Sequence, residues 1–573
     1  MKKAFQLLFL FIGLFSSTYS QTTFQINNLA AFCKVWGFLK YYHPYPSRKS
    51  VDWDTVLVNN YQKVKAAQSK EEFNGILLSI TQKTGELKPV KHSFHPSDSE
   101  AINADFKWMD DTTILSSQLC EYLKRVKLNH LPFKNKYVKA IPGAGNPLLK
   151  EDAFPRMQFP DQSYRFLALA RYWNIIQYYF PDKYLIDTDW NISLKEAIPV
   201  FMDAKDTMEY YRAIEWVTAR TDDSHANWVT PPSGWISKNK FPPLNTFYHE
   251  DTMYIIYVWN DSISGLFNIR KGDKIIAFNG ASPHSLWRDL KEHHSASNES
   301  YYTYMNALSS ELIRSDKDSS DLVIIRNGKE IHTRVKNYSL AQYIKIRGLF
   351  KPPLKNVKPY GSFSLRTDSS SGKKYLYVNM GMLCRKEVKP LIKELKNVEY
   401  LMLDDRNYPK DFRAWTRLAN NLIKGRKYFA KYTTPDYKYP GYFVYHPNCR
   451  IIGLFRKTIG RKRNNYFNGK TIILVNHGTQ SQAEYEAMTL QLIPNSILIG
   501  TQTAGADGNV STIIFPGNYS VWATCLGWYY SDGRQTQRIG IVPDIKVDYT
   551  LQSMLHHTDP IIQRALEFIR TGK

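Results

Sequence analysis

The residues best placed to do chemistry lie where a buried strand runs directly into a helix. The strand pattern from Thr471 to Asn476 is followed by a turn that ends at Ser481, and a helical pattern from Ala483 to Leu492 comes next. A helix start offers unpartnered N–H groups and the positive end of the helix dipole, which can stabilise an oxyanion when a serine attacks a carbonyl. The same position suits a plain helix cap, because Glu484 stands three residues after Ser481 and completes a capping-box pattern.

A nucleophilic serine needs a base, and a histidine occurs in a second segment. Residues 221–225 read Thr-Asp-Asp-Ser-His at the end of a helical region. Histidine has an ordinary pKa near 6.5, so His225 could take up and return a proton at neutral pH. A nearby carboxylate, such as Asp222 or Asp223, would raise that pKa, and burial would lower it. A lone Ser-His pair is more often structural than catalytic, so its assignment depends on the wider pattern.

The wider pattern consists of ordered motifs in the last third of the chain. The sequence V-N-x-G-T-x-S-x-x-E is matched from Val475 to Glu484, and G-x-x-T-x-G is matched from Gly500 to Gly505. A tyrosine and Asp-Gly-Arg turn follows from Tyr530 to Arg534, and G-I-x-P-D is matched from Gly540 to Asp544. In this order the motifs resemble those of the C-terminal-processing (tail-specific, tricorn-like) serine peptidases, over about residues 170–550.

The resemblance implies a multidomain α/β protein with a mixed α/β, crotonase-like peptidase core. It implies hydrolysis of peptide bonds in polypeptide substrates or at peptide C-termini, with no metal and no organic cofactor. Many members of the family activate the serine with a lysine directly after the G-x-x-T-x-G glycine, where this chain has Ala506. The tricorn-like branch instead uses a histidine of a Ser-His pair. The implied roles are therefore Ser481 as nucleophile, His225 as general base and Ser224 as the residue that holds the imidazole.

The resemblance also assigns residues to substrate binding. The backbone N–H of Gln482, together with Gly478 and Asn407, would form the oxyanion and substrate-binding region. The family's L-D-x-R-G-N-x-G-G loop corresponds to residues 403–411, where every glycine is replaced. The acidic residue of the tricorn-like branch corresponds to Gln537, which could orient Ser224 through hydrogen bonds but carries no charge. A rival interpretation is an inactive homologue that only binds peptides: the missing glycines favour it, and the retention of Ser481 and His225 favours the enzyme.

The first 230 residues contain an internal repeat. A shift of 137 residues holds without a gap and pairs Trp36 with Trp173, Asp52 with Asp189, Trp53 with Trp190 and Thr81 with Thr218. Each copy reads as an apolar helix that stops at Tyr-Tyr-x-Pro, followed by two amphipathic helices. We predict duplicated N-terminal helical modules joined by a linker at 141–160. Only the second copy ends in Ser-His, because the first has Leu87 and Lys88 at the corresponding positions.

From about Phe241 the pattern changes to short β runs. Residues 266–282 contain a Lys-Gly-Asp turn, an apolar strand and an Asn-Gly turn, which resembles the second half of a PDZ domain. Residues 285–312 would contain its helix and 322–335 its last hairpin, although any small β domain could carry the same turns. Strands then alternate with helices, which predicts a mixed or parallel sheet from the segments 374–379, 400–404, 471–476, 496–500 and 521–526.

The N-terminus predicts export. Lys2 and Lys3 precede an apolar run from Leu7 to Phe15 and small polar residues up to Ser20, which is the order of a secretory signal. The run is too short to span a bilayer, and no later run is long enough, so we expect a periplasmic or secreted chain without an integral membrane span. The expected organisation is a signal peptide at 1–20, helical copies at 21–140 and 141–235, a PDZ-like domain at 236–340 and the peptidase core at 341–573.

Charge and cysteine content limit the partners. The formal net charge of +24 is spread along the chain, with its densest cluster between Arg456 and Arg463. Nucleic acid, an anionic cell surface or a solvated basic face could each explain it; export disfavours nucleic acid, and weak contact with anionic envelope polymers stays an alternative. The five cysteines have no metal-type spacing, and export permits a disulfide without requiring one.

Overall fold

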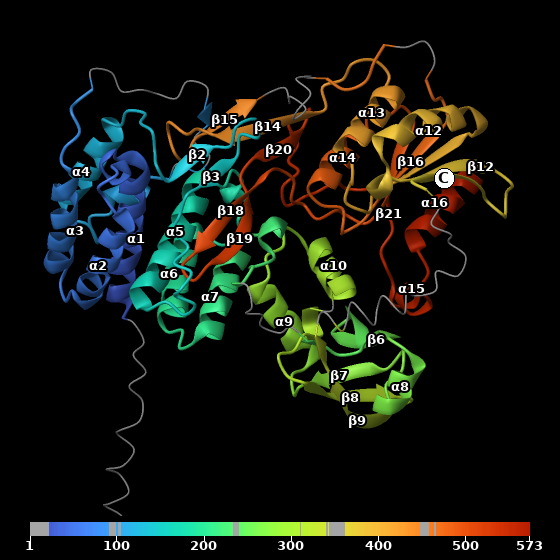
Figure 1. Cartoon of the computed structure of the whole chain (residues 1–573), viewed down its shortest axis with the longest axis horizontal. Coiled ribbons are helices and arrows are strands. Elements are labelled where there is room, and N and C mark those ends of the chain that lie inside the picture. Colours follow the sequence, from blue (N-terminus) through green and yellow to red (C-terminus); the bar gives the residue numbers. More distant parts are fainter. Residues whose placement is uncertain are drawn as a thin grey trace, which may run out of the picture.

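The computed structural model describes residues 22–90, 99–100, 103, 105–232, 240–309, 311–339, 342, 361–446, 458–462 and 466–573. The predicted signal peptide, Cys449, and Arg456, Lys457 and Arg463 of the basic cluster lie outside these residues. Figure 1 shows helices α1 to α7 on one side, a small sheet with strands β6 to β9 below, and a second α/β region around β16 on the other side. None of the described helices is long and apolar enough to cross a membrane.

The helical region follows the sequence pattern of the two copies. The first set consists of α1 (Thr23–Tyr42), α2 (Trp53–Ala66) and α3 (Lys70–Thr84), followed by α4 (Ser117–Leu128). The second set consists of α5 (Gln162–Tyr179), α6 (Trp190–Met202) and α7 (Thr207–Ala219). Helices α1 and α5 end at their Tyr-Tyr pairs, as predicted. Asp52 and Asp189 cap α2 and α6 by accepting two backbone N–H bonds each, which explains where these helices begin.

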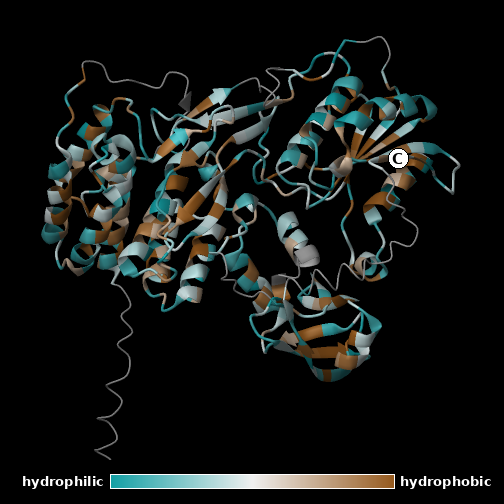
Figure 2. Ribbon diagram, viewed as in Figure 1, coloured by the Kyte–Doolittle hydropathy of each residue, from teal (hydrophilic) through white to brown (hydrophobic). Residues whose placement is uncertain are grey.

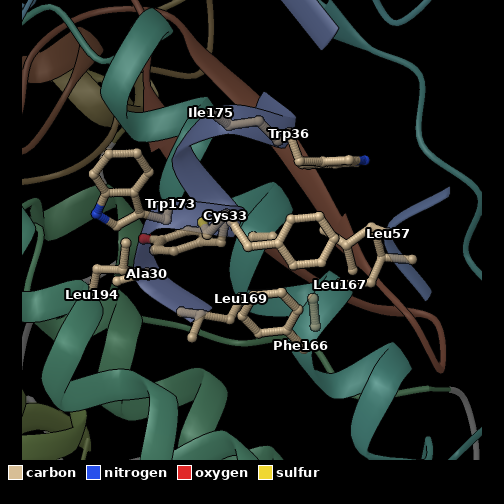
Figure 3. Close-up of a cluster of buried hydrophobic side chains, with 14 of the residues drawn as sticks. Ala30, Cys33, Trp36, Leu57, Phe166, Leu167, Leu169, Trp173, Ile175 and Leu194 are labelled. Atoms are coloured by element: carbon tan, nitrogen blue, oxygen red, sulfur yellow. The ribbon is translucent and has the colours of Figure 1, made fainter. Parts of the chain in front are cut away.

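Equivalent buried contacts occur in the two sets of helices. The indole of Trp36 donates to the Trp53 carbonyl and the indole of Trp53 donates to the Trp36 carbonyl. Trp173 and Trp190 exchange the same pair of hydrogen bonds 137 residues later. Figure 3 shows Trp36 and Trp173 in one buried hydrophobic cluster with Phe166 and Leu169 of α5. The core of this region therefore crosses between the two sets, and their common origin remains our prediction.

The middle of the chain forms a five-stranded antiparallel sheet in the order β5-β6-β7-β8-β9. Its strands are β5 (Leu244–His249), β6 (Thr252–Val258), β7 (Lys274–Phe278), β8 (Ser319–Arg326) and β9 (Lys329–Lys336). It is accompanied by α8 (Asp261–Phe267), α9 (Pro283–His293) and α10 (Glu299–Ser309). One helix was expected between the Asn-Gly turn and the last hairpin; the structure has two, because α9 ends at His294 in extended backbone. The PDZ-like assignment remains a prediction.

A six-stranded sheet forms the α/β region, in the order β11-β12-β13-β16-β17-β21. Its strands are β11 (Phe363–Thr367), β12 (Lys374–Asn379), β13 (Tyr400–Asp404), β16 (Lys470–Val475), β17 (Ser496–Gly500) and β21 (Ile545–Lys546). From β12 onward neighbouring strands are parallel, so their carboxyl ends meet at one edge. Helices α12 (Val388–Glu394), α13 (Phe412–Leu422), α14 (Gln482–Leu490) and α16 (Pro560–Thr571) accompany it. Helix α15 (Leu551–His556) packs instead on β5 and β6 of the five-stranded sheet. Figure 2 shows hydrophobic residues along the strands of the six-stranded sheet.

Smaller sheets join these regions. Strands β1 (Ser99–Glu100), β15 (Phe443–His446), β14 (Ala430–Pro435) and β20 (Gly527–Tyr530) form one sheet, and β4 (Lys240–Phe241) pairs with β10 (Tyr338–Ser339). The hairpin of β18 (Val510–Phe515) and β19 (Tyr519–Thr524) contributes to the hydrophobic core of the helices. Part of the predicted linker is ordered, because β3 (Pro147–Leu149) pairs with β2 (Val138–Ala140) and its Pro147 carbonyl accepts from Ser511.

Candidate active site

Ser481 lies at the start of α14, directly after the loop that leaves β16. Its backbone has φ 57° and ψ −120°, a conformation that is costly for a residue with a side chain. Such a sharp strand-to-helix turn presents a nucleophile above the sheet. The prediction that Ser481 occupies the helix cap is confirmed, and its left-handed φ sets it apart from the extended caps of α2 and α6. The backbone strain is an observation that the simple capping interpretation does not explain.

Glu484 holds this turn against the segment that follows β17. The carboxylate is fully buried and accepts from the N–H groups of Ser481 at 3.1 Å, Gly505 at 2.8 Å and Ala506 at 3.0 Å, and from the Thr503 hydroxyl. Burial raises the pKa of Glu484 to about 7, while these four donors act in the opposite direction. The glutamate of the predicted capping box therefore positions the serine and residues 503–506 as one unit.

His225 lies in a short 3₁₀ turn, Ser224–Ala226, after α7. Its Nδ1 is 2.8 Å from the Thr524 hydroxyl, which donates to Asp223 Oδ1 at 2.9 Å. The single proton of Thr524 is thereby used, so Nδ1 of His225 must be the donor and Nε2 carries no proton. Nε2 is buried and has no hydrogen-bond partner among the described residues. This is the tautomer that a general base requires.

Asp223 is the acidic residue behind this histidine. It is fully buried, and its carboxylate also accepts from the N–H of Thr524 at 2.7 Å and from that of His225 at 3.1 Å. Its Oδ1 is 3.7 Å from His225 Nδ1, so the charge acts through the Thr524 hydroxyl. Burial lowers the pKa of His225, and the charge of Asp223 raises it. Asp222 points elsewhere and pairs with Arg538 at 2.9 Å.

Ser224 and Gln537 are near the histidine but differ from their predicted roles. The Ser224 hydroxyl donates to the Ala504 carbonyl at 2.9 Å and accepts from the Ser297 N–H at 2.8 Å. It therefore ties the turn to the neighbouring segments, and the contact with Nδ1 comes from Thr524 instead. Gln537 donates to Asp223 Oδ1 at 3.3 Å, so it supports the carboxylate and not Ser224.

Residues 504–506 connect the serine with the histidine. The Ala504 carbonyl accepts from Ser224, the Ala504 N–H donates to Thr479 at 3.0 Å, and the Ala506 carbonyl accepts from the Ser481 N–H at 2.9 Å. Ser481 Oγ and His225 Nε2 do not form a hydrogen bond, since Nε2 is unpartnered. Catalytic hydrogen bonds are often absent from unliganded sites and form when substrate binds.

The predicted oxyanion and substrate residues surround the serine. Asn407 and Gly478 line one pocket together with Tyr304 of α10, Tyr408 and Gln480. A side chain at Gly478 would come within 2.8 Å of the Tyr304 ring, so this position requires glycine. Gln482 is the first residue of α14, where the backbone N–H has no acceptor within the helix. The loop with Asn407 is fixed by Arg406, which pairs with Asp404 and Asp559.

Sequence reasoning missed the contact of Thr524 with His225 and the contacts of Glu484 with residues 503–506. These partners are separated along the chain, and no local pattern pairs them. It also missed Asp507, which lines a pocket beside Ser481. A weak signal existed for Thr524, because it ends a strand pattern, but nothing in the sequence pairs it with residue 225. No group of three or more His, Cys, Asp and Glu residues suited to a metal ion occurs in the described part of the chain.

Comparisons with known proteins show what this chain is similar to. Residues 374–547 match the model of peptidase family S41. A stretch of 106 residues is 38% identical to the carboxy-terminal-processing protease of Bartonella bacilliformis (strain ATCC 35685 / KC583 / Herrer 020/F12,63), covering 16% of this chain and 24% of that protein. The chain thus matches about a quarter of the length of this curated relative. Residues 374–547 therefore resemble peptidase family S41, and part of the chain is similar to a carboxy-terminal-processing protease.

Solved structures agree on the fold. Mature CPAF complexed with lactacystin is 14% identical, with a TM-score of 0.52 over 71% of this chain and 98% of that chain. Mature CPAF alone is 15% identical, with the same TM-score over 71% of this chain and 96% of that chain. At this identity the likeness concerns the fold alone, and it extends well beyond residues 374–547.

Proposed function

We propose that this chain is an exported serine peptidase that hydrolyses peptide bonds, with Ser481 as nucleophile and His225 as general base. The observation that carries the proposal is the chain of hydrogen bonds from Asp223 through Thr524 to Nδ1 of His225. It leaves Nε2 free of a proton in a buried position, on the far side of the ring from the carboxylate. The buried His43 differs in its tautomer, because its Nδ1 accepts from the Tyr45 N–H and its proton is therefore on Nε2.

The reaction would proceed by acyl transfer to water. Nε2 of His225 takes the proton of the Ser481 hydroxyl as Oγ attacks the carbonyl carbon. The Gln482 N–H, with the loop of Asn407, stabilises the negative charge on the carbonyl oxygen. The Asp223 charge, transmitted through Thr524, stabilises the imidazolium. His225 then gives the proton to the leaving amine, and a water molecule attacks the acyl-enzyme in the same way and releases the acid.

An active-site probe tests this assignment. A fluorophosphonate reagent should label wild-type protein at Ser481, and Ser481→Ala should abolish the labelling. His225→Ala should slow labelling by about 10³-fold or more, since the base is lost. His43→Phe is the matched control: His43 is also buried, but at the end of α1 in the first helical copy. Labelling that persists at the wild-type rate in His225→Ala would contradict the mechanism and favour the peptide-binding alternative.

The five-stranded sheet is proposed to hold an extended peptide by strand addition, as PDZ domains do. Strand β5 is the edge strand of that sheet, and α10 packs next to it and reaches the active-site pocket through Tyr304. A peptide held there would be guided toward Ser481. If fragment 240–340 folds and binds none of a library of peptides with free carboxylates, this role is wrong.

Export is proposed from the N-terminal residues alone. Cleavage after Ser20 would be seen as a mature N-terminus at Gln21 when the chain is produced in a Gram-negative host and its mass is measured. Retention of residues 1–20 on protein recovered from the cytoplasm would contradict it.

A further inference from the structure

A second pocket opens beside Ser481, on the side of α13 and α14. The space within it that a water molecule can reach is about 30 Å³, and Ser481, Gln482 and Asp507 lie on its wall. Three aromatic residues also line it, Phe412, Tyr485 and Trp528, together with Gly508 and Asn509. The rings of Tyr485 and Trp528 pack edge to face with centroids 4.8 Å apart, and both residues are buried. The pocket is thus a partly aromatic recess next to Ser481, with one acidic group on its wall.

The acidic group has no counter-ion. Asp507 is 4% exposed, and its Oδ1 accepts only the N–H of Gly508 at 2.8 Å. Its Oδ2 has no hydrogen-bond partner, and no ion pair to it forms among the residues that the structure describes. Burial and the charge of Glu484 raise the pKa of Asp507 well above its usual range. An unpartnered buried carboxyl costs free energy, so a ligand group that pairs with Oδ2 of Asp507 would be bound strongly.

The walls and the acid together fit one class of ligand. A lysine or arginine side chain has a long apolar stem that packs along aromatic surface and a cationic head that pairs with a carboxylate. Aromatic rings also attract cations directly. An apolar side chain would fill the recess but leave Asp507 Oδ2 unpaired, and an acidic side chain would add a second negative charge beside it.

We propose that Asp507 selects substrates with a lysine or arginine on the amino side of the bond that Ser481 cleaves. This inference rests on the proposed function, because it names the side chain accepted by the same site. The position after Gly505 carries Ala506 and no lysine, so no protein cation competes for the carboxylate there. Asp507 is a specificity-determining residue in this scheme and takes no part in proton transfer.

An ion pair between Asp507 and a cationic side chain would change the protonation of Asp507, whereas contact with the aromatic walls alone would not. In the empty pocket Asp507 holds its proton to higher pH than an ordinary aspartate. A bound cation favours the carboxylate, so binding releases a proton, and affinity for a cationic side chain increases as pH rises toward the pKa of the empty site. An uncharged side chain would bind without this proton release.

Binding is measured first, in the inactive Ser481→Ala protein. Acetylated peptides that end in arginine, lysine, leucine or glutamine are titrated by calorimetry in two buffers of different ionisation enthalpy. We expect the arginine and lysine peptides to bind roughly 10- to 100-fold more tightly than the leucine peptide, with proton release. Adding Asp507→Asn should remove both the preference and the proton release. Asp532→Asn, an exposed aspartate at the Tyr530–Arg534 turn, is the matched control and should retain both.

Turnover is measured separately with the otherwise wild-type protein. The ratio of kcat/KM for arginine and leucine substrates should fall by roughly 10- to 100-fold in Asp507→Asn. Equal cleavage of both substrates by wild type, or a preference for glutamine or leucine, would overturn the proposal while leaving the peptidase function intact. Tight, proton-releasing binding of arginine peptides without any cleavage would support the pocket and refute the peptidase function.

Discussion

The Thr524 hydroxyl has one proton and two neighbours that could share it. Because it donates to Asp223, it can only accept from His225, and this fixes which imidazole nitrogen is free. The usual arrangement, in which a carboxylate contacts the imidazole directly, is replaced by a relay with a hydroxyl between them. The relay keeps the charge of Asp223 at 3.7 Å from Nδ1, where it still stabilises an imidazolium.

The relay predicts a pH profile. The proposed mechanism requires the base form of His225. Burial lowers the pKa of His225, so kcat/KM should rise with pH through a midpoint below 6.5. Asp223→Asn removes the charge that raises this pKa, so the acid limb should move to lower pH while kcat falls by about 10²- to 10⁴-fold. Thr524→Val should lower kcat to a similar extent, and Thr524→Ser should restore most of it. An acid limb above 6.5, or full activity in Thr524→Val, would contradict the relay.

The strained backbone of Ser481 predicts that glycine at this position increases the stability of the protein, although it removes the serine hydroxyl. Its φ of 57° and ψ of −120° suit glycine far better than a residue with a Cβ. Ser481→Gly should therefore unfold at a higher temperature than Ser481→Ala, by the equivalent of about 1 kcal/mol. Both variants lack the nucleophile, so thermal unfolding compares them without any effect of turnover. Equal unfolding temperatures would show that the turn is not strained.

The sequence predicts the position of a site residue where the neighbouring residues in the chain determine it. Ser481 was placed at a helix start by the strand, turn and capping pattern around it, and the structure has it there. Ser224 was assigned to the imidazole because the two are adjacent, yet its hydroxyl bonds to Ala504. Its neighbour in space, Thr524, is 299 residues from His225 along the chain, and contacts over that distance leave no periodicity to detect.

At the scale of elements, the β18–β19 hairpin connects the helices to the active site. Phe515 stacks on Tyr172 of α5 with centroids 5.5 Å apart, and the Tyr210 hydroxyl of α7 donates to the Pro516 carbonyl. Strand β19 ends at Thr524, so the packing of the hairpin on the helices sets the position of the relay.

The hairpin predicts a coupling between packing and catalysis. Phe515→Ala removes a buried ring that is 1% exposed, so it should destabilise the protein by about 3–5 kcal/mol and lower kcat by displacing Thr524. Trp522→Ala changes an aromatic residue of the same hairpin that is 57% exposed. It should leave the stability of the protein and kcat nearly unchanged. Thermal unfolding and kcat of the two variants test this. A kcat unaffected by Phe515→Ala in the folded protein would show that the hairpin does not position the relay.

The sequence predicts which segments form strands and helices, but it does not predict which strands pair with one another. The runs at 374–379, 400–404 and 496–500 match strands β12, β13 and β17, because buried parallel strands are short, apolar and bounded by turns. The predicted strand 521–526 is only partly a strand, because β19 ends at Thr524, and it belongs to the hairpin on the helices and not to the main sheet. The sequence pattern predicts a strand here, but it does not predict the hydrophobic core on which the buried face of the strand packs.

At the scale of the whole molecule, the candidate site lies where three regions meet. Asp223 and Ser224 follow the helices, and their N–H groups donate to Ser295 and Ser297, which lie between α9 and α10. Ser224 also bonds to Ala504 of the α/β region. A site assembled in this way depends on the docking of all three regions, which is a reason why the family motifs alone did not define its hydrogen bonds.

Buried acids at these junctions predict how stability depends on pH. Asp182, at the end of the second copy's first helix, is 1% exposed; its Oδ1 accepts from Gln535 and its Oδ2 has no partner. Burial, with a contribution from the charge of Asp223, raises the pKa of Asp182 to about 7. The folded state therefore binds this proton more tightly than the unfolded chain, where an aspartate has a pKa near 3.9. Stability is lost as pH rises between these two values.

Asp182→Asn should remove this loss. Asparagine keeps the shape and can still accept from Gln535, so the variant should match wild type near pH 4 and be more stable at pH 8, by up to about 4 kcal/mol. Thermal unfolding of both proteins from pH 4 to 8 measures the difference, and Asp532→Asn at an exposed position should show no such trend. Because the comparison isolates one side chain, the opposite effects of buried histidines such as His477, whose pKa burial lowers to about 4, cancel between the two proteins. A constant difference across the pH range would mean that Asp182 titrates alike in the folded and unfolded states, and a variant less stable at pH 8 would mean that the carboxylate is stabilised by its surroundings.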